Sequence, residues 1–198
     1  MTRRHPAFTE EHEAWRDTVR RFVDREIIPY VSAWDEAGEF PRDLYRKAAA
    51  AGLLGMGFPE EYDGVPADYF FRIVSAEEFA RAGAGGLSAS LFSHTIGAPP
   101  IAAVGSEGLK RRVLPSILSG EKISALAITE PSGGSDVASL RTSARKEKGE
   151  YIVNGEKTFI TSGMRADYYT VAVRTGGPGA ATLRARLPSL RTACGHPD

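Results

Sequence analysis

A short loop at residues 128–136, with the sequence ITEPSGGSD, gathers residue types that bind small polar ligands. Gly133 and Gly134 let a ligand approach the backbone closely, because glycine has no side chain beyond hydrogen. Their N–H groups, together with the Ser135 hydroxyl, are the kind of donor set that binds a phosphate. Thr129 supplies a further hydroxyl. By itself, the same stretch also fits an ordinary turn that caps the next segment.

A second stretch, GEKTFITSG at residues 155–163, places a flat aromatic ring two residues before a hydroxyl. If this stretch is a strand, Phe159 and Thr161 point to the same face, because side chains alternate along a strand. A ring and a hydroxyl side by side suit a flat heteroaromatic ligand that also needs one hydrogen bond. The alternative is a core phenylalanine beside a surface threonine, and the local sequence fits both.

The simpler catalytic templates are missing from the sequence. There is no phosphate loop of the G-x-x-x-x-G-K-[ST] type and no G-x-G-x-x-G loop behind a strand. The stretch GGSDV lacks the second glycine of a nucleophile elbow. His5, His12, His94 and His196 show no metal-ligand spacing, so we expect no metal site. His94 lies among apolar residues and is expected to be a hydrogen-bonded core histidine.

Composition narrows the class of partner. The chain has 198 residues with 25 basic and 25 acidic side chains, so no basic face marks it as a nucleic-acid binder. The single cysteine, Cys194, excludes an internal disulfide, and a reducing cytoplasm is the expected location. The N-terminus lacks the apolar segment of a secretory signal. The longest apolar run, Ala48 to Phe58, is too short to cross a bilayer, so we expect no membrane span.

The apolar pattern predicts helices up to residue 120. A first helix is expected after the capping residue Thr9, with an interruption at Pro29. Further helices are expected from Pro41 to Ala51, around residues 70–82 and 107–119, and as a pair over residues 87–104 that is broken at Pro99-Pro100.

After residue 120 the apolar pattern changes to the alternation of strands. Asn154-Gly155 lies between two apolar runs and predicts a type I′ hairpin turn, and Lys148-Gly149 predicts a second turn. Short strands joined by such turns favour a small antiparallel barrel or sandwich. The predicted fold class is therefore α+β and multidomain, with a helical domain over residues 1–120 and a β domain over 121–181. Residues 182–198 fit neither pattern and are interpreted as a disordered tail or as non-native sequence.

Two long segments, in this order, resemble one family. The segment AITEPSGGSDVASLRTSARKEKGEYIVNGEKTFITSG is similar to the flavin-binding middle domain of the acyl-CoA dehydrogenases. The segment from Phe8 to Gly64, FTEEHEAWRDTVRRFVDREIIPYVSAWDEAGEFPRDLYRKAAAAGLLGMGFPEEYDG, resembles their N-terminal helical domain. The resemblance covers residues 8 to about 180 and implies an FAD-dependent enzyme that oxidises an acyl-CoA thioester between its α and β carbons.

The resemblance also implies roles for individual residues. The residues implied to contact FAD are Leu126, Ile128, Thr129, Gly134, Ser135, Phe159, Ile160 and Thr161. Thr129 would bond the pyrimidine side of the flavin, and Thr161 would bond flavin N5. Ser135 would lie at the phosphates and near the substrate thioester, and Gly134 would leave room for that substrate. Phe159 would lie against the flavin ring, where many family members have tryptophan.

The family carries its catalytic glutamate in a third, C-terminal helical domain, and no glutamate of this sequence matches it, so we list no catalytic residue. The implied partners are an acyl-CoA substrate, an electron-transfer flavoprotein as electron acceptor, and further copies of the full-length chain in a homo-oligomer. We expect a truncated form of the enzyme. The alternatives are a non-catalytic fragment that binds FAD or acyl-CoA, a related flavin oxidase or monooxygenase, and an unrelated helical interaction protein with a β domain.

Overall fold

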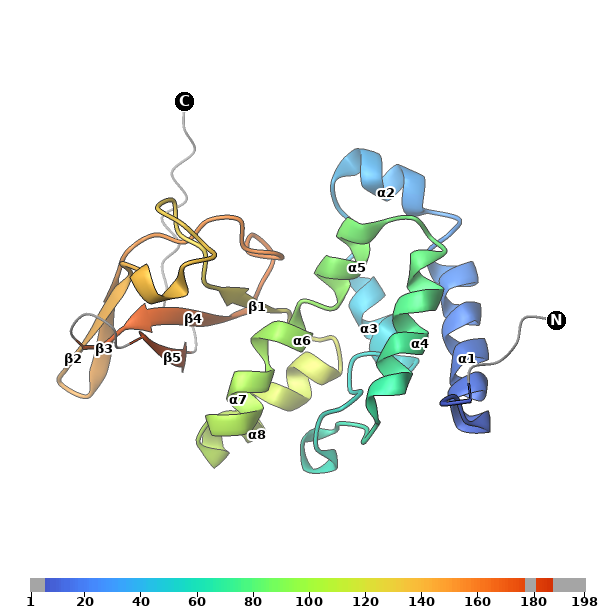
Figure 1. Cartoon of the computed structure of the whole chain (residues 1–198), viewed down its shortest axis with the longest axis horizontal. Coiled ribbons are helices and arrows are strands. Elements are labelled where there is room, and N and C mark those ends of the chain that lie inside the picture. Colours follow the sequence, from blue (N-terminus) through green and yellow to red (C-terminus); the bar gives the residue numbers. More distant parts are fainter. Residues whose placement is uncertain (1–5, 177–180, 187–198) are drawn as a thin grey trace.

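The protein consists of a helical domain followed by a small β domain, which confirms the α+β class (Figure 1). The computed structural model describes residues 6–176 and 181–186. The helices are α1 (Glu10–Glu26), α2 (Val31–Ala37), α3 (Asp43–Ala50), α4 (Tyr69–Ala80), α5 (Gly85–Leu91), α6 (His94–Gly97), α7 (Pro99–Val104) and α8 (Glu107–Leu118). The strands are β1 (Ser124–Ala127), β2 (Ser143–Glu147), β3 (Glu150–Asn154), β4 (Tyr168–Arg174) and β5 (Ala181–Arg186).

The predicted helix boundaries agree closely with the structure. The Thr9 side chain caps α1 by accepting from the His12 backbone N–H, and the interruption at Pro29 separates α1 from α2. The segment 87–104 differs, because it forms three short helices instead of a pair. Pro99 begins α7, which suits a residue whose N–H would have no helical partner in the first turn.

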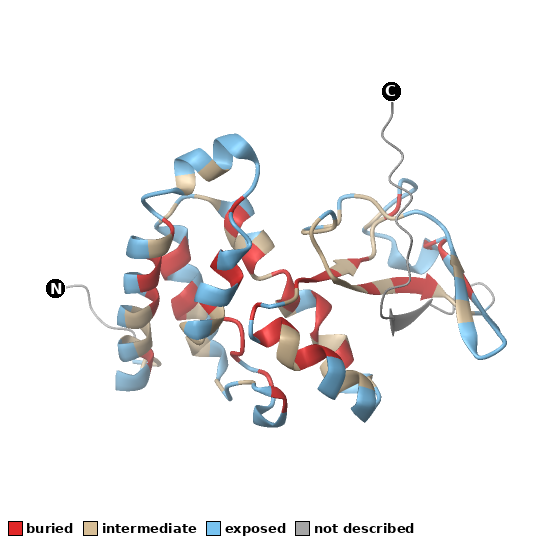
Figure 2. Ribbon diagram, turned by 180° about the vertical axis from the view of Figure 1, so that it is seen from behind, coloured by how far each residue is buried: buried red, intermediate tan, exposed pale blue. Residues whose placement is uncertain are grey.

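The core of the helical domain extends into the first strand of the β domain. Figure 2 shows buried residues along the inward faces of the helices and exposed residues along the outward faces. The main apolar cluster includes Val19, Val23, Leu44, Leu54, Leu91 and Ile123. Because Ile123 immediately precedes β1, the loop that follows β1 starts from a fixed point in the core.

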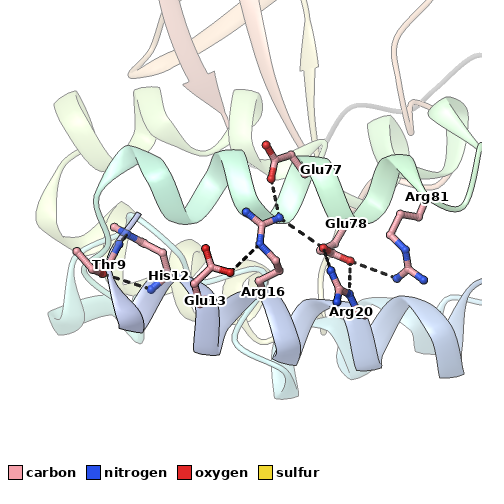
Figure 3. A network of polar contacts seen from close by, with 8 residues as sticks. All are labelled: Thr9, His12, Glu13, Arg16, Arg20, Glu77, Glu78 and Arg81. Carbon is pink, nitrogen blue, oxygen red and sulfur yellow. Dashed lines mark hydrogen bonds and ion pairs between the residues drawn. The ribbon is translucent and has the colours of Figure 1, made fainter. Parts of the chain in front are cut away.

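Charged side chains hold α1 against α4 (Figure 3). Glu78 is almost fully buried on α4, and its carboxylate accepts from Arg20 at 2.8 Å and from Arg81 at 3.2 Å. Arg16 extends the network to Glu77 at 2.6 Å. Hydrogen bonds from Arg20, ahead of the opposing effect of burial, lower the pKa of Glu78 below its usual value. The carboxylate is therefore charged at neutral pH and forms part of the helix interface.

His94 is the hydrogen-bonded core histidine that the sequence predicts. Its side chain is 3% exposed, and Nε2 donates to the Leu54 carbonyl oxygen at 2.8 Å. Burial, only partly opposed by the hydrogen bonds to Leu54 and Leu91, lowers the pKa of His94 from 6.5 to about 4. The imidazole is therefore neutral in the folded protein at pH values where the unfolded chain carries a proton.

Stability is expected to fall as pH decreases through this window. The unfolded chain takes up the His94 proton near pH 6.5, and the folded chain only near pH 4. The free energy of unfolding is therefore unaffected by His94 above pH 6.5 and decreases as the pH falls from 6.5 towards 4. The loss should approach about 3 kcal/mol at pH 4. Urea unfolding at pH 7 and pH 4.5 gives the change in the free energy of unfolding for wild type and for His94→Gln. The difference between these two changes is the effect of His94. Equal pH slopes for both would contradict a buried neutral imidazole.

The sheet of the β domain is mixed, whereas the sequence predicted an antiparallel one. β1 pairs with β4 in parallel, with Ser124 opposite Tyr168, and β2 adds one parallel pair with β4. β2 pairs with β3, and β4 with β5, in antiparallel register. Parallel strands need a long connection, and residues 128–167 supply it here. No local turn signal marks such a pairing.

The tight hairpin turn lies at Lys148-Gly149 and not at Asn154-Gly155. Lys148 and Gly149 have φ angles of 47° and 87°, as a type I′ turn requires, and they join β2 to β3. The prediction for Asn154-Gly155 was wrong, because β3 ends there and the chain leaves the sheet. A Cβ at Gly155 would lie 2.6 Å from the Thr142 Cα and Oγ1 atoms. The glycine therefore permits a close backbone crossing.

The predicted tail begins inside a strand. β5 covers Ala181–Arg186 and pairs along β4 from Arg174 back to Tyr169. Residues 182–186 are therefore part of the sheet, because pairing with β4 outweighs a sequence with few apolar residues. Residues 187–198, the rest of that predicted tail, lie outside the described residues. Across the described helices, none is both long and apolar enough to cross a membrane.

Candidate functional site

The loop after β1 forms a tight turn that leaves its later residues exposed. The Glu130 and Gly133 backbones exchange N–H···O hydrogen bonds of 3.0 Å in both directions. The Gly133 N–H is therefore already paired and is not available as a phosphate donor, which leaves the Gly134 N–H and the Ser135 hydroxyl of the predicted nest. Gly134 lies close over Thr129, since a Cβ at Gly134 would be 3.0 Å from the Thr129 methyl carbon. Ser135 is exposed beyond this turn.

The second predicted stretch is a loop rather than a strand. Phe159 and Ser162 have φ angles of 54° and 61°, which no strand contains. The predicted strand face shared by Phe159 and Thr161 is therefore wrong, although both side chains are exposed, with Phe159 at 91%. Residues 156–158 pair with the loop after β1 instead of folding back on β3, because the Thr158 N–H donates to the Thr129 carbonyl oxygen at 2.9 Å.

A buried ion pair joins the two loops. Lys157 Nζ donates to Glu130 Oε1 at 2.9 Å and to the Ile128 carbonyl oxygen at 2.8 Å. Both side chains are mostly buried, at 10% and 4% exposure. The loop after β1 and the loop after β3 therefore behave as one unit, although 27 residues separate Glu130 from Lys157 in the sequence.

Both oxygens of the Glu130 carboxylate accept hydrogen bonds. The carboxylate accepts from the backbone N–H groups of Arg141 and Thr142 at 2.6 and 2.8 Å, and from the Thr142 hydroxyl at 2.5 Å. Burial alone would raise the pKa of Glu130, but these hydrogen bonds and the one from Lys157 lower it to about 2. A carboxylate of such low basicity is a structural anchor and a poor general base. Sequence reasoning missed this pair, whose signal was an acid three residues after a buried strand and a lysine two residues before the aromatic residue.

The helical domain fixes the far end of the second loop. Asp167, the residue before β4, accepts from the Ile123 N–H at 2.8 Å and pairs with Arg42. Arg165 Nη2 donates to the Phe40 carbonyl oxygen at 2.7 Å, and its guanidinium lies 4.8 Å from the Phe40 ring centre. One end of the loop over residues 155–167 is thus held by the buried Glu130–Lys157 pair, and the other by the backbones of the buried residues Ile123 and Phe40.

Beside these loops lies an open cleft of about 510 Å³. Its lining residues are Ala127, Thr142, Val153, Gly155, Glu156, Lys157, Thr158, Phe159, Ile160, Gly163, Met164, Tyr169 and Val171. Phe159 and Ile160 are the predicted ligand contacts among them. Met164, 82% exposed, adds a second bare apolar side chain at the cleft. A size of this order suits one flat, drug-sized ring system.

The other predicted contacts lie on the neighbouring chain segments. Leu126 and Ile128 are half-buried at the end of β1 and just after it, while Thr129 and Gly134 line the turn that Lys157 braces. Across the described residues, no group of three or more histidine, cysteine, aspartate or glutamate side chains could hold a metal ion. The structure thus brings the two predicted motifs together, through the hydrogen bond between Thr158 and Thr129 and the contacts of Lys157 with Glu130 and Ile128.

Comparison with known protein families shows which family the chain belongs to. The family model described as acyl-CoA dehydrogenase, N-terminal domain, matches residues 9–121, and the one described as acyl-CoA dehydrogenase, middle domain, matches residues 125–188. The chain belongs to the acyl-CoA dehydrogenase family. The resemblance drawn from the sequence is therefore confirmed for both domains.

Several acyl-CoA dehydrogenases of known sequence are similar to this chain. The mitochondrial long-chain specific acyl-CoA dehydrogenase of Sus scrofa is 38% identical over 168 residues, which are 85% of this chain and 39% of that protein. An acyl-CoA dehydrogenase of Bacillus subtilis is 40% identical over 81% of this chain and 42% of its own length. The chain thus spans about two-fifths of the curated relatives it matches.

Solved structures of acyl-CoA dehydrogenases show the same fold. A putative acyl-CoA dehydrogenase from Mycobacterium smegmatis is 49% identical with a TM-score of 0.88, over 92% of this chain and 49% of that one. An acyl-CoA dehydrogenase from Bacillus anthracis, solved in complex with FAD, is 36% identical with a TM-score of 0.81, over 90% of this chain and 31% of that one.

Proposed function

We propose that this chain carries the flavin-facing surface of an acyl-CoA dehydrogenase, which uses FAD to oxidise an acyl-CoA thioester between its α and β carbons. The observation that supports this most is that Lys157 and the Thr158–Thr129 hydrogen bond join the loop that carries Thr129 to the loop that carries Phe159 and Thr161. Bound FAD would accept the hydride that the protein alone has no group to accept.

The residues present fit a flavin ring. The exposed Phe159 and Met164 side chains offer apolar area at a cleft of suitable size, and an exposed apolar pair of this kind marks a binding surface. The Thr161 hydroxyl is exposed on the same loop and would donate to flavin N5. A larger residue at position 134 would crowd Thr129, because a Cβ there would lie 3.0 Å from the Thr129 methyl carbon.

We assign the remaining contacts from the family resemblance. Leu126, Ile128 and Ile160 would line the flavin, and Ser135 would contact its phosphates and lie near the substrate thioester. Holding the ring and the thioester together supplies orientation, which is a large part of enzymatic rate enhancement. We name no catalytic base among the described residues, because Glu130 is too weakly basic, and we propose that the family's C-terminal domain supplies it.

The wider context is part of the same proposal. The partners would be an acyl-CoA, an electron-transfer flavoprotein and further copies of the full-length chain. We propose residues 1–120 as the helical folding unit, and we extend the predicted β unit from residues 121–181 to residue 186, where β5 ends. A cytoplasmic location remains our proposal from the single cysteine, and the relative from Sus scrofa is named as mitochondrial.

Ser135 and Thr161 are expected to affect FAD differently. Ser135→Ala should weaken FAD binding by about 1 to 2 kcal/mol through the loss of a phosphate contact. Thr161→Ala should shift the reduction potential of bound flavin more than its affinity, because its partner would be the redox-active nitrogen. Equilibrium titration with FAD and a dye-coupled reduction measure the two quantities. Negligible effects of both substitutions on a flavin-binding wild type would sink the assignment.

A further inference from the structure

Two residues that flank Thr161 adopt a backbone conformation that side chains disfavour. Ser162 has φ 61° and Phe159 has φ 54°, both in the left-handed region where glycine is normally found. Neither residue is a glycine, so contacts elsewhere must hold this loop in place. The residues that supply those contacts therefore decide where the Phe159 ring and the Thr161 hydroxyl point.

The Ser162 side chain is tied to the helical domain. Its Oγ atom lies 2.9 Å from the Ser90 Oγ atom on α5 and donates to the Ser90 carbonyl oxygen at 3.3 Å. The Tyr45 hydroxyl, from α3, donates to the same carbonyl oxygen at 3.0 Å. Tyr45 is buried, so Ser90 is itself held from the core.

The backbone around Ser162 closes into a compact turn. The Ser162 carbonyl oxygen accepts from the N–H groups of Arg165 and Ala166 at 2.9 Å each, and the Gly163 N–H donates to the Ile160 carbonyl oxygen at 2.8 Å. Phe159 and Thr161 remain exposed outside this turn. The turn is rigid within itself, so its orientation depends on what anchors it from outside.

The anchored turn separates two clefts. The first is the 510 Å³ cleft beside Phe159, and the second, of about 440 Å³, lies between α2, α5 and the loop. Ile160, Gly163 and Met164 line both, while Ser90 and Ser162 line the second. The Ser90–Ser162 contact therefore connects α5 to one side of this turn. The opposite side lines the cleft that is proposed to hold the flavin.

We propose that Ser162, held by Ser90 of α5, is a positioning residue that fixes the flavin-facing loop and acts through Thr161. The pair couples the helical domain to the place where the redox-active part of the flavin would lie. The role toward flavin rests on the proposed function, whereas the anchoring of the loop can be measured without any ligand.

Amide hydrogen exchange of residues 157–163 tests the anchoring in the 198-residue chain. Ser162→Ala should speed exchange there by about three- to tenfold, which is what the loss of one hydrogen bond allows. Ser90→Ala should have a smaller effect, because the Ser90 carbonyl oxygen still accepts from Ser162. Ser88→Ala is the matched control on the same helix, since its hydroxyl donates only to the Ala84 carbonyl oxygen. Unchanged exchange in Ser162→Ala would overturn the inference, whatever FAD does.

Titration with FAD tests whether the anchoring matters through Thr161. Ser162→Ala should weaken FAD binding by about three- to tenfold. It should also shift the potential of bound flavin in the same direction as Thr161→Ala, and the double variant should show no further shift. Faster exchange with unaltered affinity and potential, or additive shifts in the double variant, would overturn the positioning role. A wild type that binds no FAD would instead overturn the proposed function and, with it, the role toward flavin.

Discussion

Replacing Glu130 by alanine is expected to destabilise the β domain by about 3 to 5 kcal/mol, because a buried ion pair that loses one partner leaves the other charge uncompensated. Lys157 would keep only the Ile128 carbonyl oxygen, and the backbone N–H groups of Arg141 and Thr142 would lose their acceptor. The two loops would keep the Thr158–Thr129 and Lys157–Ile128 hydrogen bonds but lose the ion pair, so FAD binding should weaken even where the domain still folds.

Three further variants make this prediction specific. Glu147→Ala removes a carboxylate of β2 that is 46% exposed and pairs with Arg145, so it should change stability by less than about 0.5 kcal/mol. Lys157→Met is the second variant, and its combination with Glu130→Ala is the third. The double variant should cost less than the sum of the two single changes, since neither charge is then left alone. Urea unfolding followed by circular dichroism gives all four values. A Glu130→Ala protein as stable as wild type would show that the pair does not join the loops.

A polypeptide of these 198 residues is expected to oxidise acyl-CoA at least about 10²-fold more slowly than a full-length relative, because a positioned general base contributes about 10²- to 10⁴-fold. The buried carboxylate that joins the two loops, Glu130, has a pKa of about 2 and cannot take the substrate proton effectively. The exposed Phe159 and Met164 side chains also lack the cover that would keep water from the reacting atoms.

The comparison needs a range of acyl-CoA chain lengths and an artificial electron acceptor, with FAD in excess. Adding the C-terminal domain of a family member, either fused or as a separate chain, should restore part of the rate. Glu156→Gln is the matched control, because Glu156 is an exposed acid at the cleft and the proposal gives it no role. If the 198-residue polypeptide turned over nearly as fast as a full-length relative, and Glu156→Gln abolished that turnover, the base would lie in this chain.

Sequence patterns predicted the helices well because their signals are local. The helix α8 shows this clearly, since Ser106 caps its start and buried Val113, Leu114, Ile117 and Leu118 follow at helical spacing. The same reasoning failed at Asn154-Gly155, where a strong hairpin signal lost to a close crossing with Thr142. The parallel pairing of β1 with β4 was equally out of reach, because it joins segments about 40 residues apart.

The sequence paired the two loops of the candidate site, but it did not predict their conformation. The family resemblance named Thr129 and Phe159 together, and the structure places their loops in contact. The sequence around Phe159 did not predict its left-handed backbone conformation, because a phenylalanine adopts that conformation only when distant groups impose it. Glu130 and Lys157 went unnoticed because each is an ordinary surface residue by sequence, and only the fold buries them against each other.

The most direct test of the flavin-facing surface is a titration of Phe159→Asp with FAD, in which binding is measured by the quenching of flavin fluorescence. Phe159 is 91% exposed, so the substitution should leave the fold intact while placing a charge where the ring would lie. Tyr69→Asp is the control, since Tyr69 is a 72% exposed aromatic residue on α4, in the other domain. We expect saturable binding of one FAD per chain by wild type and by Tyr69→Asp, and at least about tenfold weaker binding by Phe159→Asp, which corresponds to the loss of one aromatic contact. Binding by Phe159→Asp that equals wild type, or no binding by wild type, would contradict the account.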